Sequence, residues 1–522
     1  MSRKGTSRRN ENILLLMEGD ISDVNLSCEE SDEENDIFIQ RKGIFTEAID
    51  DQQSTKKFGL KIETIGAESD SDTEDDTPLS NQLRVKSLRW KSRDIKVIDC
   101  NCNIKFAKPV PEIPALRYFK QFLTTEIIHH LTIQTNLYSI QKSGTSINVT
   151  EKEIEQFFGI HILSGIIKVP SIKCYWKDPT RFPIIADFMS QKRFFEIRNF
   201  IHFNDNTKAK SRNDENYDRL YKIRPFIDAL KRNLSKLKNE EYNSVDEVII
   251  PLRGHNSSLN QYLRGKTYRH QKNQKCRYNC PCMGFKMFAR FGKSGILYDF
   301  EFYLGRDVLP STSGLGLNGD IVLRLCDNLS SSENYKILID SKFNSHSLIV
   351  ALKERGLFAL GTIRPSKLPG CVFRNYSELK KRVRGAYDYR TEQSTNIIAL
   401  KWWGTYKPIY IASSYSSIHP MESIASWSST RKKLRDFSVP HLLYEYNQCV
   451  GGVDLHNMLL ELYRIDIRAK RYYLRVVFNL IDSCLVNSWL LYRRHYDLGG
   501  VKCKSLLDFR SEIAYGLLQT RH

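Results

Sequence analysis

The chain has 522 residues, of which 41% are hydrophobic and 11% aromatic, and it carries a net charge of +19. One hydrophobic core does not support that length, so we expect about two to four structural units. Residues 11–80 hold 20 acidic and 5 basic residues, a net of −15, which leaves 74 basic and 40 acidic residues, or +34, elsewhere. A body this basic predicts a polyanionic partner, most simply a nucleic acid, with a generally basic surface as the alternative.

Apolar runs, cysteines and basic clusters indicate the compartment in which the protein works. No apolar run approaches the roughly 20 residues that span a membrane, so we expect no membrane partner. Leu14–Leu16 is too short for the core of a signal peptide. The 12 cysteines are mostly dispersed, which is typical of reduced thiols in the cytosol or nucleus. Basic clusters at residues 3–9 and 431–433 resemble nuclear import signals, although such clusters also occur by chance. We expect a nuclear protein.

The N-terminal region is acidic and of low complexity. Runs at residues 32–34 and 69–76 have too little apolar surface to offset the entropy of ordering. We therefore expect a disordered acidic N-terminus and place its boundary at residues 1–95. From about residue 115 the apolar residues recur at helical spacing, as in Phe119, Phe122 and Ile127. We expect a helical domain, first part, at 96–241.

The next segment changes its hydrophobic period from helical to strand-like. We expect strands at 244–250, 285–291 and 297–304, then a helix at 319–329, a strand at 335–340, a helix at 345–355 and a strand at 358–363. This is the order of an RNase H-like core, an α/β fold built on a mixed five-stranded sheet, and we place its first part at 242–365. In that order the first and fourth strands are neighbours, so Asp246 would lie beside Asp340.

The remaining chain divides into three parts. Residues 396–403 and 408–413 are typical of a hairpin, and we expect an insertion domain at 366–440. A last core helix is expected at 441–463, and a second part of the helical domain at 464–522.

A carboxylate follows a double glycine at Gly451–Gly452–Val453–Asp454, where the backbone can turn sharply and begin a helix. Cleavage of a phosphodiester needs charge to be neutralised on the attacking and leaving oxygens, which two divalent ions held by carboxylates achieve. Mg²⁺ prefers oxygen ligands and keeps several waters. Asp246, Asp340 and Asp454 are therefore our candidate catalytic and metal-binding residues. The alternative for each is structural, as a turn former or a helix cap.

An ordered series of motifs resembles the piggyBac transposases and their domesticated relatives, over about residues 110–495. The matching segments are Phe200–Asn206, which contains the "HFND" signature, Asp218–Pro225, Ser244–Pro251 with Gly254, Gly451–Leu455, Lys470–Arg475 and Val486–Trp489. The resemblance implies an RNase H-like core carrying three essential aspartates that match Asp246, Asp340 and Asp454. It also implies flanking helical parts that form a dimerisation and DNA-binding domain.

Members of the family excise a DNA transposon with Mg²⁺, form hairpinned ends and join the element into TTAA targets. The resemblance thus implies double-stranded DNA as partner, two Mg²⁺ ions that Mn²⁺ can replace, a homodimer as one assembly, and no small-molecule substrate.

Four departures from the family pattern leave a second interpretation open. Ser341, Lys342 and Phe343 follow Asp340 where the family has Asn and then aromatics, and Asn457 replaces a fourth acidic residue. Residues 267–282 stand in place of a Lys-Pro…Trp-Gly-Phe-Lys run. Beyond Cys484 only Cys503 remains, so we expect no zinc module. The second interpretation is a domesticated protein that binds DNA or chromatin and no longer cuts DNA. A third is an interaction scaffold that uses its acidic tail to recruit basic partners.

Three further groups of residues carry weaker signals. Cys276, Cys280 and Cys282 beside His270 match no common zinc module, so no zinc is expected there. Trp402–Trp403 would stack on a displaced base, or one ring would pack into the core and leave the other partly exposed. Basic residues near the aspartates are candidate phosphate contacts, with solvated surface charge as the alternative for each: Arg253, Lys266, Arg269, Lys342, Arg468, Lys470 and Arg471.

Overall fold

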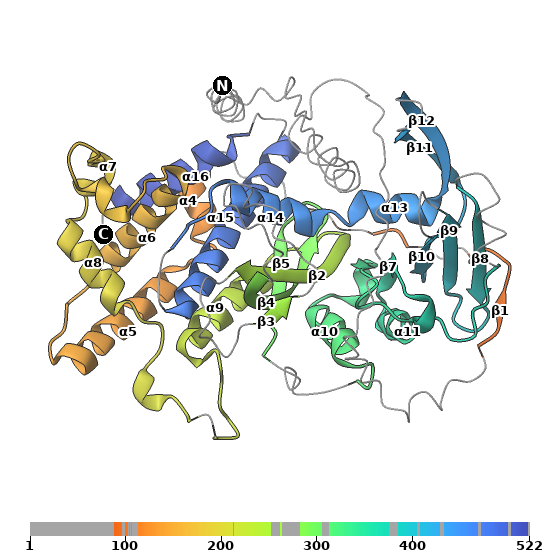
Figure 1. Cartoon of the computed structure of the whole chain (residues 1–522), viewed down its shortest axis with the longest axis horizontal. Helices are drawn as coiled ribbons and strands as arrows, with labels where there is room; N and C mark the ends of the chain where they lie inside the picture. Colours follow the sequence, from red (N-terminus) through yellow and green to blue (C-terminus); the bar gives the residue numbers. More distant parts are fainter. Residues whose placement is uncertain are drawn as a thin grey trace, which may run out of the picture.

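The computed structural model describes residues 88–519 except 97–99, 103, 105, 107–112, 212, 252–260, 264–281, 305–312, 375–384, 404–407, 429–432, 468–470 and 500–502. The protein is a mixed α/β structure in which a ten-stranded sheet adjoins a helical body (Figure 1). The predicted disordered N-terminus lies outside the described residues, apart from 88–95. For 88–95 the prediction is wrong, because Trp90 and Lys91 pair with Glu392 and Thr391 and Ile95 is buried.

The sheet has the strand order β1-β8-β9-β10-β7-β6-β2-β4-β3, with β5 also paired to β4. Its strands are β1 (Trp90–Lys91), β2 (Tyr242–Pro251), β3 (Gln261–Leu263), β4 (Cys282–Gly292), β5 (Leu297–Phe302), β6 (Lys336–Ile339), β7 (Phe358–Thr362), β8 (Tyr387–Glu392), β9 (Ile398–Trp403) and β10 (Pro408–Ser413). A separate two-stranded sheet joins β11 (Met421–Ser428) to β12 (Lys433–Pro440).

The predicted pairing at the centre of the sheet is confirmed. β2 is parallel to β6, and β6 is parallel to β7. β2 is antiparallel to β4, and β4 is antiparallel to β5. The hairpin of β9 and β10 also forms as predicted. Because β10 pairs with β7, strands β8 to β10 of the segment expected as an insertion extend the central sheet, and of the described strands only β11 and β12 form a sheet of their own. The expectation of a five-stranded sheet is therefore wrong, since the sheet has ten strands among the described residues.

Helices cover both faces of the central strands because side chains alternate between the two faces of a strand. On one face Phe288 and Ile339 pack with the apolar residues of α10 (Leu317–Leu325) and α11 (His346–Glu354). On the other face Leu338 packs with α13 (His441–Cys449), and Val248 and Ile250 share a core with α14 (Gly452–Leu462). Figure 1 shows α13 and α14 following one another along the sheet.

The helical body combines segments from both ends of the described chain. It contains α4 (Ala115–Phe119), α5 (Thr125–Ser143), α6 (Glu151–Ile166), α7 (Pro183–Ala186), α8 (Gln191–Phe200), α9 (Arg224–Ser235), α15 (Tyr472–Gly499) and α16 (Leu506–Gln519). α16 packs on α6, and α4 contacts α15 and α16 (Figure 1). The two parts that the sequence predicted as helical therefore share one core.

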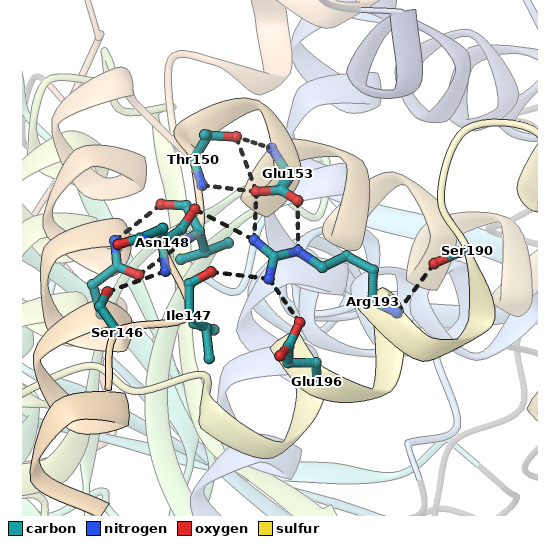
Figure 2. Close-up of polar contacts among 10 residues, drawn as sticks. Ser146, Ile147, Asn148, Thr150, Glu153, Ser190, Arg193 and Glu196 are labelled. Carbon is teal, nitrogen blue, oxygen red and sulfur yellow. Dashed lines mark hydrogen bonds and ion pairs between the residues drawn. The ribbon is translucent and has the colours of Figure 1, made fainter. Parts of the chain in front are cut away.

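One side chain fastens α8 to the beginning of α6 (Figure 2). Thr150 and Glu153 form a reciprocal capping box, in which the Thr150 hydroxyl accepts from the Glu153 amide at 3.3 Å and Glu153 accepts from the Thr150 amide at 2.9 Å. Arg193 donates to both carboxylate oxygens of Glu153, at 2.6 and 2.9 Å, and to the Ile147 carbonyl at 3.0 Å. Burial favours the neutral acid, but the bonds from Arg193 and Thr150 outweigh it and hold the pKa of Glu153 below its ordinary value.

One helix corrects an expectation about membranes. No apolar run near the length of a membrane span was expected from the sequence, yet Tyr472–Asp497 of α15 is long and apolar enough by length and composition to cross a membrane. Its apolar window is 94% buried inside the protein, which is the environment of a core helix.

Candidate functional site

The pairing of β2 with β6 brings two of the candidate aspartates together. Val245 is paired with Ile339 in the parallel register, so the next residue of each chain segment, Asp246 and Asp340, comes side by side where β6 ends. Neighbouring strands lie about 4.8 Å apart and paired residues point to the same face. Two carboxylates 94 positions apart in the sequence thus become neighbours.

Asp340 is held in place from its own turn and from the next strand. One of its carboxylate oxygens, Oδ1, accepts from the Ser341 amide at 2.7 Å and from the Thr362 hydroxyl at 3.0 Å. The Asp340 carbonyl accepts from the amides of Phe343 and Asn344, both at 3.0 Å. The turn after β6 is therefore closed, and β7 orients the carboxylate.

Asp454 is the third residue of α14, and the beginning of that helix lies against the turn between β4 and β5. A β-carbon on Gly452 would lie 2.1 Å from the Gly292 carbonyl oxygen, so only glycine permits this approach. His456 Nδ1 lies 2.9 Å from the Gly295 carbonyl oxygen, and burial lowers the pKa of His456 to about 4. The imidazole is neutral at pH 7, which suits a single donor at Nδ1. α14 thus covers the sheet face on which Asp246 lies.

The chemistry of this donor set suits a hard divalent cation. Adjacent carboxylates supply the oxygen ligands that Mg²⁺ and Mn²⁺ prefer, and these ions retain several waters of their own. Among the described residues, no group of three or more His, Cys, Asp or Glu side chains is arranged to hold an ion. The three predicted aspartates are thus not gathered into one such group: the register of β2 and β6 places Asp246 beside Asp340, and Asp454 lies on α14, which contacts β2.

Behind this pair lies a charged cluster that sequence reasoning found only in part. Glu247 Oε1 lies 2.6 Å from Lys286 Nζ and 2.8 Å from Lys342 Nζ. Burial favours the neutral acid, but the two ammonium groups outweigh it and hold the pKa of Glu247 below its ordinary value. Lys342 was predicted as a phosphate contact, whereas Glu247 and Lys286 were not singled out. The available signal was a glutamate within an apolar strand, because buried Glu is rarely left unpaired.

The other predicted phosphate contacts divide into two groups. Arg471 donates to the backbone carbonyls of Ile201, at 3.0 Å, and Arg198 at the end of α8, where a cation is favoured. Its guanidinium thus serves the fold. The remaining candidates lie outside the described residues: Arg253, Lys266, Arg269, Arg468 and Lys470.

The two weaker predictions concern the tryptophan pair and the cysteine-rich segment. Trp402 and Trp403 are 1% and 7% exposed, so the hypothesis that they stack on a displaced base is wrong. Of the suggested zinc ligands, His270, Cys276 and Cys280 lie outside the described residues, as does the Cys282 side chain.

The "HFND" signature has a structural role in the described loop. Asn204 donates to the Tyr221 carbonyl at 2.8 Å, and Asp205 accepts from the Thr207 amide at 3.0 Å and from Gln141 at 2.9 Å. The Tyr221 hydroxyl in turn donates to the Asp205 carbonyl at 2.9 Å. These bonds fold the loop after α8 and attach it to α5.

Comparison with known proteins agrees with this arrangement. The family described as Transposase IS4 matches residues 114–489, and the chain belongs to that family of transposases. It is 26% identical over 540 aligned residues to human PiggyBac transposable element-derived protein 3, covering 95% of this chain and 86% of that protein. It is 28% identical over 418 residues to human PiggyBac transposable element-derived protein 2, covering 78% and 66%.

A solved structure has a similar fold. The piggyBac transposase in a synaptic complex with hairpin DNA, determined by cryo-electron microscopy, superposes with a TM-score of 0.63 at 21% identity. The match covers 78% of this chain and 80% of that one. The resemblance to piggyBac transposases predicted from the motifs is confirmed.

Proposed function

We propose that this protein binds double-stranded DNA and carries a metal-dependent site for DNA strand cleavage and transfer at TTAA sequences. The observation that carries the proposal is the register of β2 and β6, which makes Asp246 and Asp340 neighbours. The strand order, with β2, β6 and β7 parallel and β4 and β5 antiparallel, supports an RNase H-like core. Residues 366–440 would be its insertion and the helical body its dimerisation and DNA-binding domain.

Asp246, Asp340 and Asp454 would hold two Mg²⁺ ions, with Mn²⁺ as a substitute. When bound, such ions neutralise charge on the attacking and leaving oxygens of a phosphodiester. The protein's own contribution is orientation. Thr362 and the Ser341 amide fix one oxygen of Asp340, and the close approach of Gly452 to Gly292 fixes the helix that carries Asp454.

DNA is the proposed partner for two independent reasons. Outside residues 11–80 the chain carries a net charge of +34, which favours a polyanion. The similar solved structure is of a transposase in a synaptic complex with hairpin DNA. Action on DNA implies a nuclear location, and a homodimer is the proposed assembly.

A second candidate function is favoured by a specific observation near the site. Lys342 forms an ion pair with Glu247 two residues after Asp340, at a position where the family has an aromatic residue. Together with Asn457 this supports a domesticated protein that binds DNA or chromatin without cutting it.

One experiment separates the two functions. The purified full-length protein is incubated with a duplex that carries a transposon end flanked by TTAA, in Mg²⁺ or Mn²⁺, beside D246N. An exposed aspartate changed in the same way, D214N, is the control. We expect metal-dependent nicking that D246N loses and D214N retains. Nicking that survives in D246N would reject the metal assignment, and salt-sensitive binding without nicking would establish the second function. A protein that does not bind DNA at any salt concentration would reject both.

A further inference from the structure

Two lysines share one buried carboxylate immediately behind the aspartate pair. The Glu247 side chain is 4% exposed, and Lys286 and Lys342, at 2.6 and 2.8 Å from its Oε1, are 12% and 43% exposed. Glu247 and Lys286 are therefore the buried members of the cluster, and Lys342 is the member whose side chain reaches solvent.

The alternation of β2 places this cluster on the face opposite the aspartates. Glu247 follows Asp246, so the two side chains point to opposite faces. Glu247 is paired with Phe288 of β4, and Lys286 lies two residues from Phe288 on the same face. The Lys286 ammonium also lies 4.7 Å from the centre of the Phe288 ring and 5.2 Å from that of Tyr303. An ion pair and two aromatic rings thus keep Lys286 in place.

The charge of the cluster does not balance. Two ammonium groups face one carboxylate, so the three side chains together carry a net positive charge. Lys286 is the more buried of the two, and burial lowers its pKa. Lys342 belongs to the turn that follows Asp340, so this partly exposed side chain lies at the same end of β6 as the aspartate pair.

We propose that the cluster of Glu247, Lys286 and Lys342 binds a phosphate of the DNA backbone next to the aspartate pair. Lys342 is the contact residue, and Glu247 and Lys286 are its positioning residues. A free lysine loses much rotamer entropy when it is fixed on a ligand, whereas Glu247 has already ordered Lys342. Because Lys286 shares that carboxylate, Glu247 does not cancel the charge of Lys342. This inference rests on the proposed function and adds to it a phosphate-binding residue particular to this chain.

The test measures binding of the full-length protein to a fluorescent TTAA-containing duplex without divalent metal, over a range of salt concentrations. The variants are K342M, which keeps the aliphatic stem, and K504M as control, because Lys504 is 49% exposed and pairs with Glu512 at 2.5 Å. We expect K342M to lower affinity about threefold or more and to reduce the slope of log affinity against log salt by about 1. K504M should change neither.

A double-mutant cycle tests the positioning role. If Glu247 acts through Lys342, the effect of E247Q on affinity should differ by about threefold or more between the wild-type and K342M backgrounds. Affinity and salt slope unchanged in K342M, with its melting temperature unchanged, would overturn the contact. Equal effects of E247Q in both backgrounds would overturn the positioning role. A wild-type protein that does not bind duplex DNA would instead reject the proposed function itself, and this outcome differs from normal wild-type binding that K342M leaves unchanged.

Discussion

Gly452, at the beginning of α14, approaches Gly292 so closely that a β-carbon on Gly452 would lie 2.1 Å from the Gly292 carbonyl oxygen. Gly292 is paired with Asn243 of β2, three residues before Asp246. The position of Asp454 relative to the sheet therefore depends on the absence of a side chain at Gly452.

Replacing this glycine should displace the helix. In G452A a β-carbon would collide with backbone atoms, which cannot move as a side chain does. We expect the free energy of unfolding to fall by about 1–3 kcal/mol and Mn²⁺ affinity to decrease. Chemical denaturation and calorimetry measure these effects. The control is G516A on α16, whose β-carbon would meet the end of the Leu116 side chain at 3.0 Å. Unchanged Mn²⁺ affinity in G452A would show that Asp454 does not depend on this contact.

The Thr362 hydroxyl should orient the Asp340 carboxylate for metal binding. T362V keeps the shape of the side chain and removes the 3.0 Å hydrogen bond to Asp340 Oδ1. Loss of a bond that orients a metal ligand typically lowers metal affinity about tenfold or more, and we expect a decrease of that size for Mn²⁺. The control is T391V in β8, which loses a 2.6 Å bond to the Arg93 carbonyl. Equal Mn²⁺ affinities in the two variants would contradict a role for Thr362.

A buried ion pair holds the last two long helices together. Asp482 of α15 and Arg510 of α16 are 0% and 1% exposed, with 2.5 Å between Oδ1 and the guanidinium. Burial raises the pKa of Asp482, although Arg510 opposes the rise. R510M leaves the carboxylate without that partner and should cost about 3–5 kcal/mol of unfolding free energy at pH 7.

The pH dependence of R510M follows from the same carboxylate. A raised pKa penalises the charged form, so the loss should shrink as pH falls toward about 4, the pKa of an unfolded aspartate. The double variant D482N/R510M should recover part of the loss at pH 7. Urea denaturation at pH 4 and pH 7 measures both effects. A loss that is equal at the two pH values would rule out this explanation.

Glu392 should contribute stability that is lost in acid. Its carboxylate accepts from the amide and hydroxyl of Ser394 and Thr395, at 2.6–2.9 Å, and from the Arg89 amide at 3.3 Å. Burial favours the neutral acid, but these bonds outweigh it and lower the pKa of Glu392 from 4.5 to about 2. A depressed pKa adds stability that is present above pH 4.5 and disappears as pH falls toward 2.

The variant E392Q tests this pH window. It should be less stable than the wild-type protein at pH 7, and the two unfolding free energies should converge between pH 4.5 and pH 2. Urea denaturation across that range measures the convergence. E354Q, at an exposed glutamate of α11, should follow the wild-type curve throughout. A difference between E392Q and wild type that stays constant with pH would contradict the assignment.

Local patterns in the sequence predicted most elements of the sheet. The period of two in 285–291 and 297–304, with glycines at 292 and 295 between them, identified β4 and β5, and the apolar run before Asp340 identified β6. The order of these elements is that of an RNase H-like core, in which the first and fourth strands are neighbours, and it therefore predicted that β2 would lie beside β6. The nearness of Asp246 and Asp340 followed from that order. It needed no knowledge of side-chain packing.

Other features were decided by the tertiary structure alone. Arg471 serves as a cap for α8, Trp402 and Trp403 are both buried, and the hairpin of β9 and β10 continues the central sheet. A sequence does not state which backbone carbonyl or which strand edge a distant residue will meet. Those partners are chosen by packing among elements far apart in the chain.

The sequence by itself determined the family, the central strands and the identity of the three candidate aspartates, because each depends on residue types, motifs and local period. Only the tertiary structure decided how those aspartates are held. The Thr362 bond to Asp340, the contact between Gly452 and Gly292, and the sharing of Glu247 by Lys286 and Lys342 all depend on distances across the sheet. The physical reason is that hydrogen bonds and ion pairs act over a few ångströms in space, whatever the separation of their partners along the chain.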